Sequence, residues 1–196
     1  QRQMCIRDRM RAFFAKTTVL LAKNGQTPQF WYEGNAGIYH PGETVYAWRQ
    51  DQALQSIEKT KKAGLNLIMA SNEYCYLDFP QIQGQRNWGW MKTTTLQKCY
   101  ELDPAFGKPE KEAGHIRGVH APVWAERLPD LDHLLYRAYP RACAIAEAGW
   151  SPMSVRSWEN FRRKLADHRQ FILKRFNYDM KRTQGNEPAF RWENNK

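Results

Sequence analysis

The sequence predicts an α/β fold in which parallel strands alternate with helices. Short segments rich in β-branched, aromatic or aliphatic residues recur along the chain, and segments with apolar residues at helical spacing stand between them. This order is typical of a parallel sheet covered by helices. The 196 residues suffice for one sizeable core, whereas a complete eight-stranded α/β barrel usually takes about 250 residues.

The first part of the chain predicts a helix, two strands and a second helix. Residues 10–23 carry apolar side chains at helical spacing and end before an Asn-Gly stop signal. Residues 29–33 and 44–49 are short and rich in aromatic or β-branched side chains, which predicts two strands. Residues 51–63 have one apolar face and stop at a glycine, which predicts a helix.

The second part predicts two more strands and two helical regions. The apolar runs at 65–70 and 116–124 predict strands, and residues 72–98 form a long insertion between them. Residues 132–150 predict a helical region with a Pro-Arg pair in its middle, and residues 158–175 predict a last helix. Four parallel strands with open edges make either a small open sheet or half of a closed barrel, and periodicity does not choose between them.

The formal net charge of +10 raises the possibility of a nucleic-acid or anionic-membrane partner. Acidic and basic residues nearly balance over residues 24–153, so the surplus lies in the two terminal segments. Solvated faces of amphipathic helices explain that surplus, and no basic motif interleaved with aromatic residues is present. We keep nucleic-acid binding as the last of three hypotheses.

The cysteines and histidines predict neither a metal site nor a cofactor. The four cysteines match no zinc or redox spacing, and the five histidines form no metal-ligand motif with them. No apolar run has membrane-spanning length, and no signal-peptide pattern is present. We expect residues 1–9 to be foreign or disordered, residues 10–178 to form the domain, and residues 179–196 to be a polar tail.

Aromatic and acidic side chains stand where the predicted strands give way to loops. They are Trp31 and Glu33, Trp48, Tyr76 and Asp78, and Trp124 and Glu126. Since ligand sites lie at the carboxyl ends of parallel strands, these residues would converge on one site. Indole rings stack on the apolar face of a pyranose and carboxylates accept hydrogen bonds from hydroxyls, so the pattern favours a sugar. The alternatives are core packing for each Trp, a surface ion pair for Glu126 and a loop cap for Asp78.

Six segments carry a resemblance to a known family. They are P-Q-F-W-Y-E-G at 28–34, V-Y-A-W-R at 45–49, Y-L-D-F-P-Q at 76–81, C-Y-E-L-D-P at 99–104, I-R-G-V-H-A-P-V-W-A-E at 116–126 and Y-P-R-A-C-A-I-A-E-A-G-W-S at 139–151. In this order and spacing, from residue 31 to about residue 178, the chain resembles glycoside hydrolase family 20, the β-N-acetylhexosaminidases. The ordered set is more specific than any one motif.

The resemblance implies a (β/α)8 TIM barrel, of which this chain supplies the second half, strands five to eight. It implies retaining hydrolysis of terminal β-linked N-acetylglucosamine or N-acetylgalactosamine, in which the substrate's own 2-acetamido oxygen is the nucleophile and forms an oxazolinium intermediate. The implied partners are an N-acetylhexosamine-containing glycan or chitooligosaccharide and the missing N-terminal half of the barrel. A periplasmic or secreted location is favoured by the resemblance.

The resemblance also implies roles for individual residues. Trp31, Trp48 and Trp124 look like the aromatic walls around the acetamido group and the sugar ring. Tyr76 looks like the hydroxyl that donates to the acetamido oxygen as it turns toward the anomeric carbon.

Further implied roles concern the outer hydroxyls of the sugar. Asp78 and Glu126 look like their acceptors. Trp90, or alternatively Trp88, looks like the loop aromatic near C6. Glu33 matches an acidic residue of the family but receives no chemical role.

The catalytic acid/base pair of the family has no counterpart here. In the family an adjacent Asp-Glu pair orients the acetamido group and transfers the proton, and no Asp-Glu dipeptide occurs in the 196 residues. The family's sugar-gripping Arg from the first strand is also absent. We expect that both lie upstream and that this chain alone does not catalyse. The second hypothesis is a non-catalytic carbohydrate-binding protein on a related barrel, which an upstream Asp-Glu pair would exclude.

Overall fold

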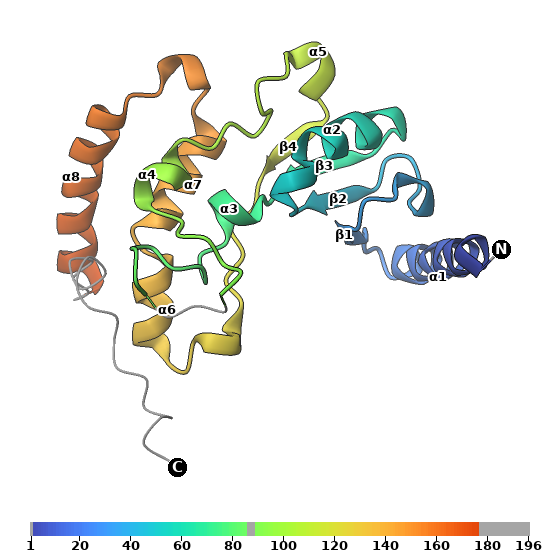
Figure 1. Ribbon diagram of the computed structural model, residues 1–196, viewed down its shortest axis with the longest axis horizontal. Coiled ribbons are helices and arrows are strands. Elements are labelled where there is room, and N and C mark those ends of the chain that lie inside the picture. The colour runs from blue at the N-terminus through green and yellow to red at the C-terminus, as the bar shows by residue number, and fades with distance from the viewer. Residues whose placement is uncertain (1, 86–88, 177–196) are drawn as a thin grey trace. The chain divides into compact units, whose positions relative to one another are not determined.

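A computed structural model describes residues 2–85 and 89–176, and the chain divides into two compact units (Figure 1). Unit 1 comprises residues 1–71 and 104–120, and unit 2 comprises residues 72–103 and 121–196.

Unit 1 contains a four-stranded parallel sheet, so the prediction of parallel strands is confirmed. In spatial order its strands are β1 (Gln29–Tyr32), β2 (Thr44–Ala47), β3 (Asn66–Met69) and β4 (Ile116–Val119). The fourth strand is five residues shorter than the run at 116–124 predicts. Pro122 has no backbone N–H to donate to a neighbouring strand. The apolar run therefore continues beyond β4 as a loop.

The strand register gives the sheet two different faces. Tyr46 pairs with Trp31 on one side and with Ile68 on the other, and these three half-buried side chains form a row across the sheet. The next residue along each strand belongs to the opposite face, because side chains alternate. That opposite row is fully buried.

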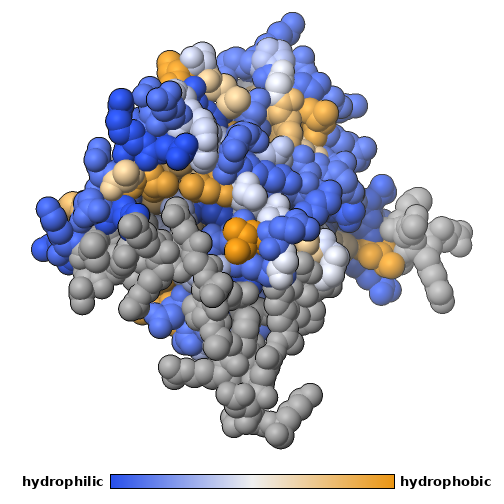
Figure 2. All heavy atoms as spheres, turned by 60° about the vertical axis from the view of Figure 1, so that its left-hand side comes forward, coloured by the Kyte–Doolittle hydropathy of each residue, from blue (hydrophilic) through white to orange (hydrophobic). Residues whose placement is uncertain are grey.

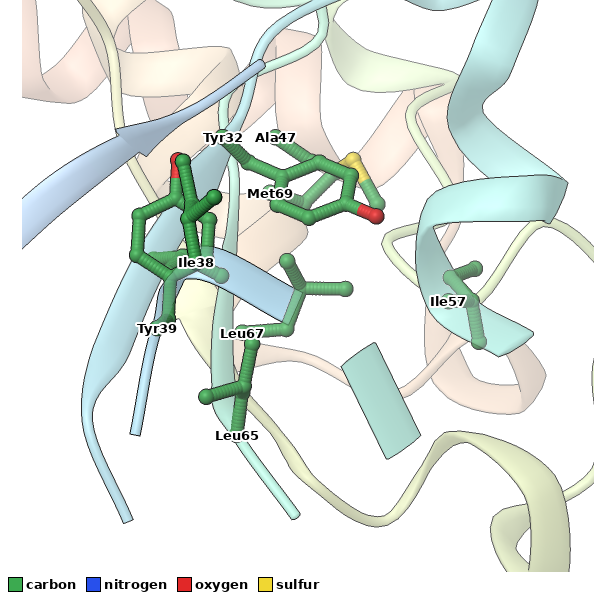
Figure 3. Close-up of a cluster of buried hydrophobic side chains, with 9 residues drawn as sticks. Tyr32, Ile38, Tyr39, Ala47, Ile57, Leu65, Leu67 and Met69 are labelled. Carbon is green, nitrogen blue, oxygen red and sulfur yellow. The ribbon is translucent and has the colours of Figure 1, made fainter. Parts of the chain in front are cut away.

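The buried face of the sheet carries the core of unit 1 (Figure 3). The core residues are Tyr32, Ile38, Tyr39, Val45, Ala47, Ile57, Leu65, Leu67 and Met69. Three helices belong to this unit, namely α1 (Arg2–Lys23), α2 (Ala53–Lys62) and α5 (Glu110–Ala113). Helix α2 contributes Ile57 to the core, and the Phe14 ring of α1 lies 4.7 Å from the Phe30 ring of β1.

Helix α1 begins at Arg2, eight residues before the helix that the sequence predicts. It therefore runs through most of the segment 1–9, where disorder was expected. The first residues of that segment are good helix formers, and a helix that is already nucleated propagates cheaply through them. The expectation that this segment is foreign stays a prediction.

Unit 2 consists of helices and loops. Its helices are α3 (Asn72–Cys75), α4 (Leu96–Tyr100), α6 (Leu131–Ala138), α7 (Arg141–Trp150) and α8 (Trp158–Phe176). The helical region predicted over 132–150 divides into α6 and α7 at Pro140, and the last predicted helix corresponds to α8. The insertion at 72–98 begins with α3 and runs into α4, neither of which was predicted. The tail from residue 177 lies outside the described residues.

The face of the molecule drawn in Figure 2 is mostly hydrophilic, with apolar side chains in separate patches. Within the ranges 2–85 and 89–176, no helix combines the length and the apolar character that crossing a membrane requires.

Candidate functional site

In unit 1, Trp48 follows the end of β2 and is held by the acid that follows β1. The indole Nε1 of Trp48 donates to Glu33 Oε1 at 3.2 Å. Arg49, which pairs with Asp51 at 2.9 Å, has its guanidinium 5.7 Å from the centroid of the Trp48 ring. Glu33 has no role in the sequence prediction, and the structure shows that it orients the Trp48 indole.

Trp31 lies on the half-buried face of the sheet, not in its core. Its ring centroid is 5.5 Å from that of Tyr46 and 6.0 Å from that of His120, and the last two rings are 5.2 Å apart. Burial lowers the pKa of His120, so its neutral form is favoured at neutral pH. The sequence prediction did not name Tyr46 or His120, although Tyr46 lies inside a predicted strand and its neighbour across the sheet is Trp31.

In unit 2, Tyr76 and Trp124 form an aromatic pair. Their ring centroids are 6.4 Å apart, and the Tyr76 ring lies 5.5 Å from that of Phe79. Tyr76 is 7% exposed and Trp124 is 40% exposed. The prediction that both residues end a strand is wrong. Tyr76 follows helix α3 and Trp124 lies five residues beyond β4, because the chain leaves the sheet before either residue is reached.

Asp78 is the most perturbed carboxyl group among the predicted site residues. Burial raises its pKa to about 6, while hydrogen bonds from the backbone N–H groups of Asp78 and Trp124 oppose this shift, and nearby Glu126 adds to it. Its Oδ1 is buried and accepts no hydrogen bond within the described residues. Asp78 therefore combines one buried oxygen that lacks a hydrogen-bond donor with a bond to the backbone of Trp124. Glu126 itself is exposed, in the 3-10 turn Ala125–Arg127.

Trp90 lies in the loop that precedes α4 and is 63% exposed. Its ring meets that of the buried Phe79 edge to face at 5.5 Å. The other candidate for the loop aromatic, Trp88, lies outside the described residues. Since Phe79 also contacts Tyr76, one buried ring touches two of the predicted sugar-contacting aromatics, Tyr76 and Trp90.

A fully buried arginine, which the sequence prediction missed, fixes the Tyr76–Asp78 segment. Arg141 donates to the backbone oxygens of Leu77 at 2.5 Å, Thr94 at 2.9 Å and Arg137 at 2.6 Å. Burial lowers the pKa of Arg141 to about 10. The sequence signal was the Pro-Arg pair at 140–141, which predicts only the start of a helix. The role of such an arginine depends on which backbone carbonyls surround it in the folded protein, and the sequence does not show these neighbours.

The two clusters supply indole surfaces, two phenols and several carboxylates. Such groups stack on a sugar ring and bind its hydroxyls. In the part of the chain that the structure describes, no three His, Cys, Asp or Glu residues are grouped so that they could hold a metal ion. The prediction that the unit 1 and unit 2 clusters bind one ligand stays a prediction.

Comparison with known proteins points to one family over most of the chain. Residues 2–153 match the family described as "Glycosyl hydrolase family 20, catalytic domain". The chain is 94% identical over 189 residues to a "Beta-hexosaminidase" of Akkermansia muciniphila, which covers 96% of this chain and 38% of that protein. It is 28% identical to a "Beta-N-acetylhexosaminidase" of Cellulomonas fimi over 72% of this chain and 29% of that protein.

Solved structures agree with these matches. A crystal structure of a beta-N-acetylhexosaminidase aligns with a TM-score of 0.90 at 94% identity, over 95% of this chain and 40% of that one. The GH20 beta-N-acetylhexosaminidase from Streptomyces coelicolor aligns with a TM-score of 0.68 at 31% identity, over 80% of this chain and 33% of that one. The chain thus spans two fifths or less of the length of these relatives.

Proposed function

Because this chain belongs to glycoside hydrolase family 20, we propose that it supplies the sugar-binding part of a retaining β-N-acetylhexosaminidase barrel. The substrate class is a glycan or chitooligosaccharide with a terminal β-linked N-acetylglucosamine or N-acetylgalactosamine. In the reaction, the 2-acetamido oxygen of the substrate attacks the anomeric carbon as the protonated leaving group departs, and water then opens the oxazolinium with retention of configuration.

The observation that carries this proposal is the cluster of Tyr76, Asp78 and Trp124. A mostly buried phenol, a carboxyl group with a free buried acceptor and an exposed indole lie together on loops of unit 2. In our proposal, the Tyr76 hydroxyl donates to the acetamido oxygen, and Asp78 accepts from an outer sugar hydroxyl. Trp124 covers the ring face, as Trp31 and Trp48 of unit 1 do elsewhere around the sugar. Glu126 accepts from a second hydroxyl and Trp90 packs near C6.

The acid/base pair of the reaction is not among these 196 residues, so we propose that this chain is the second half of the barrel. Two observations support a half barrel, and the resemblance implies strands five to eight as its share. The sheet of unit 1 has one fully buried and one half-buried face, and the latter would be covered by the strands of a first half. The A. muciniphila relative is long enough to contain such a half as well, because this chain covers 38% of its length.

The test compares this chain with a longer protein. We join this chain to the part of the A. muciniphila β-hexosaminidase that precedes the matched region, and call the product the joined protein. The joined protein is expected to hydrolyse a chromogenic N-acetyl-β-glucosaminide, and the chain alone is not. Activity of the chain alone would overturn the proposal, because another carboxylate, with Glu33, Asp78 or Glu126 as first candidates, would then act as the acid.

A non-catalytic sugar-binding protein is the second candidate, favoured by the missing Asp-Glu pair. It shares every predicted sugar contact with the first candidate. A joined protein that binds N-acetylglucosamine in calorimetry but releases no chromophore would support it.

A further inference from the structure

Glu73 fastens the loop that carries Trp90 to helix α3. Its side chain is 22% exposed, and its two oxygens hold different lysines. Oε1 lies 2.6 Å from Lys92 Nζ, and Oε2 lies 3.1 Å from Lys98 Nζ. Lys92 belongs to the loop at 89–95 and Lys98 to α4, so one carboxylate ties the loop and the helix that follows it to α3.

The backbone strengthens this attachment. Thr94 Oγ1 donates to the backbone oxygen of Glu73 at 3.1 Å, and the Thr94 N–H donates to Pro80 O at 2.7 Å. Lys98 Nζ also lies 5.4 Å from the centroid of the neighbouring Tyr74 ring. The loop is therefore held to α3 by the side chains of Lys92 and Thr94, and its backbone is bonded to Pro80.

The attachment depends on the ion pairs of Glu73 with the two lysines, so salt can weaken it. Partial burial opposes ionisation of Glu73, but the hydrogen bonds from Lys92 and Lys98 outweigh it and lower the pKa of Glu73. The carboxylate is therefore charged at neutral pH. Because the Lys92 side chain is 66% exposed, dissolved ions screen its attraction to Glu73. Exposed ion pairs contribute little to global stability, so breaking this one acts on the loop more than on the fold.

We propose that Glu73 is a positioning residue that holds Trp90 in the place from which its ring contacts the sugar. Tyr76 follows Glu73 by three residues, so the short α3 segment links the loop to the Tyr76 phenol. Trp90 has only the edge of Phe79 as a ring neighbour among the described contacts and is largely exposed, so the loop determines where its indole lies. This inference rests on the proposed function, and it adds a residue for which the resemblance implies no role.

The kinetic test uses Glu73→Gln in the joined protein with the chromogenic N-acetyl-β-glucosaminide. The Trp90 ring would contact the sugar equally in the bound substrate and in the transition state. Weakening this contact should therefore raise KM, by about two- to fivefold, and leave kcat unchanged. KM of the unsubstituted protein is expected to rise with salt, and that of the variant is not. Lys92→Met, which leaves the Glu73–Lys98 pair intact, should also raise KM but by no more than Glu73→Gln, and the double variant should raise it no more than Glu73→Gln alone. The matched control is Glu147→Gln, which removes the 3.5 Å pair with Lys164 and should leave KM unchanged.

A second measurement follows the loop itself. Chymotryptic cleavage after Trp90, followed by mass spectrometry on the 196-residue chain, should be faster in Glu73→Gln than in the unsubstituted chain. An equal cleavage rate would overturn the attachment, and faster cleavage with an unchanged KM would overturn the role in sugar binding. If the unsubstituted joined protein is inactive, the proposed function fails and the sugar-binding role fails with it, while the cleavage rate still decides the attachment.

Discussion

The two clusters of predicted sugar contacts are held in place by different means. In unit 1, Trp31 belongs to a strand and Trp48 directly follows one, so the ladder of a parallel sheet sets their positions. In unit 2, Tyr76, Asp78, Trp90 and Trp124 lie on loops beyond the strands, and side chains replace the ladder. Buried Arg141 donates to the carbonyls of Leu77 and Thr94, and Glu73 holds the loop that carries Trp90.

The two clusters are therefore sensitive to different substitutions. A sheet ladder is built from many backbone bonds, and no single side chain is essential to it. A loop cluster that depends on one guanidinium loses several bonds with one substitution. We therefore expect substitutions of supporting residues to be more harmful in unit 2 than in unit 1.

The largest effect is expected for Arg141→Leu. It leaves the carbonyls of Leu77, Thr94 and Arg137 buried without their donor, so the free energy of unfolding should fall by about 3 kcal/mol or more. Urea unfolding measures this loss, and hydrogen exchange locates it. Protection should fall at the amides of residues 77–81 and 94–100 and persist in β1 to β3. Equal loss in both units would break the contrast between them.

Tyr76→Phe comes next and changes catalysis without greatly changing the fold. Removing one hydroxyl that supports developing charge should lower kcat of the joined protein about 10²–10³-fold. The Tyr76 ring keeps its contacts with Phe79 and Trp124, so the thermal midpoint should stay close to that of the unsubstituted protein. Unchanged turnover would remove Tyr76 from this role.

Asp78 should make stability depend on pH. The carboxyl group ionises with a pKa of about 6 in the folded protein and close to 4 in the unfolded chain, so the folded state binds more protons between these values. Stability therefore falls as pH rises from 4 to 6, by about 2 kcal/mol. Asp78→Asn should remove that fall in urea unfolding measured at several pH values. An identical pH dependence in the variant would show that another group is responsible.

The smallest effect is expected for Glu33→Gln in unit 1. The variant weakens the hydrogen bond to the Trp48 indole, and the sheet register still holds the backbone of β2. We expect a loss of about 0.5–1.5 kcal/mol at most in kcat/KM of the joined protein. A loss as large as that of Tyr76→Phe would mean that Glu33 acts on the substrate itself.

The sequence predicts the parts of the molecule that depend on local pattern. The four strands, the helices α2 and α8 and the break at Pro140 follow from periodicity, proline and glycine, and the family match confirms the resemblance carried by the aromatic motifs. The sequence could not show that Tyr76 and Trp124 lie beyond the strands. An apolar run does not reveal where the neighbouring strand stops pairing with it. Arg141 and Glu73 were missed for a similar reason, since their partners lie far along the chain.

The proposal that the unit 2 cluster of Tyr76, Asp78 and Trp124 binds the sugar is tested by hydrogen exchange of the joined protein with increasing N-acetylglucosamine. We predict that the amides at residues 76–79 and at residues 124–127 gain protection with the same midpoint. Unchanged protection in either segment, or two different midpoints, would contradict the proposal.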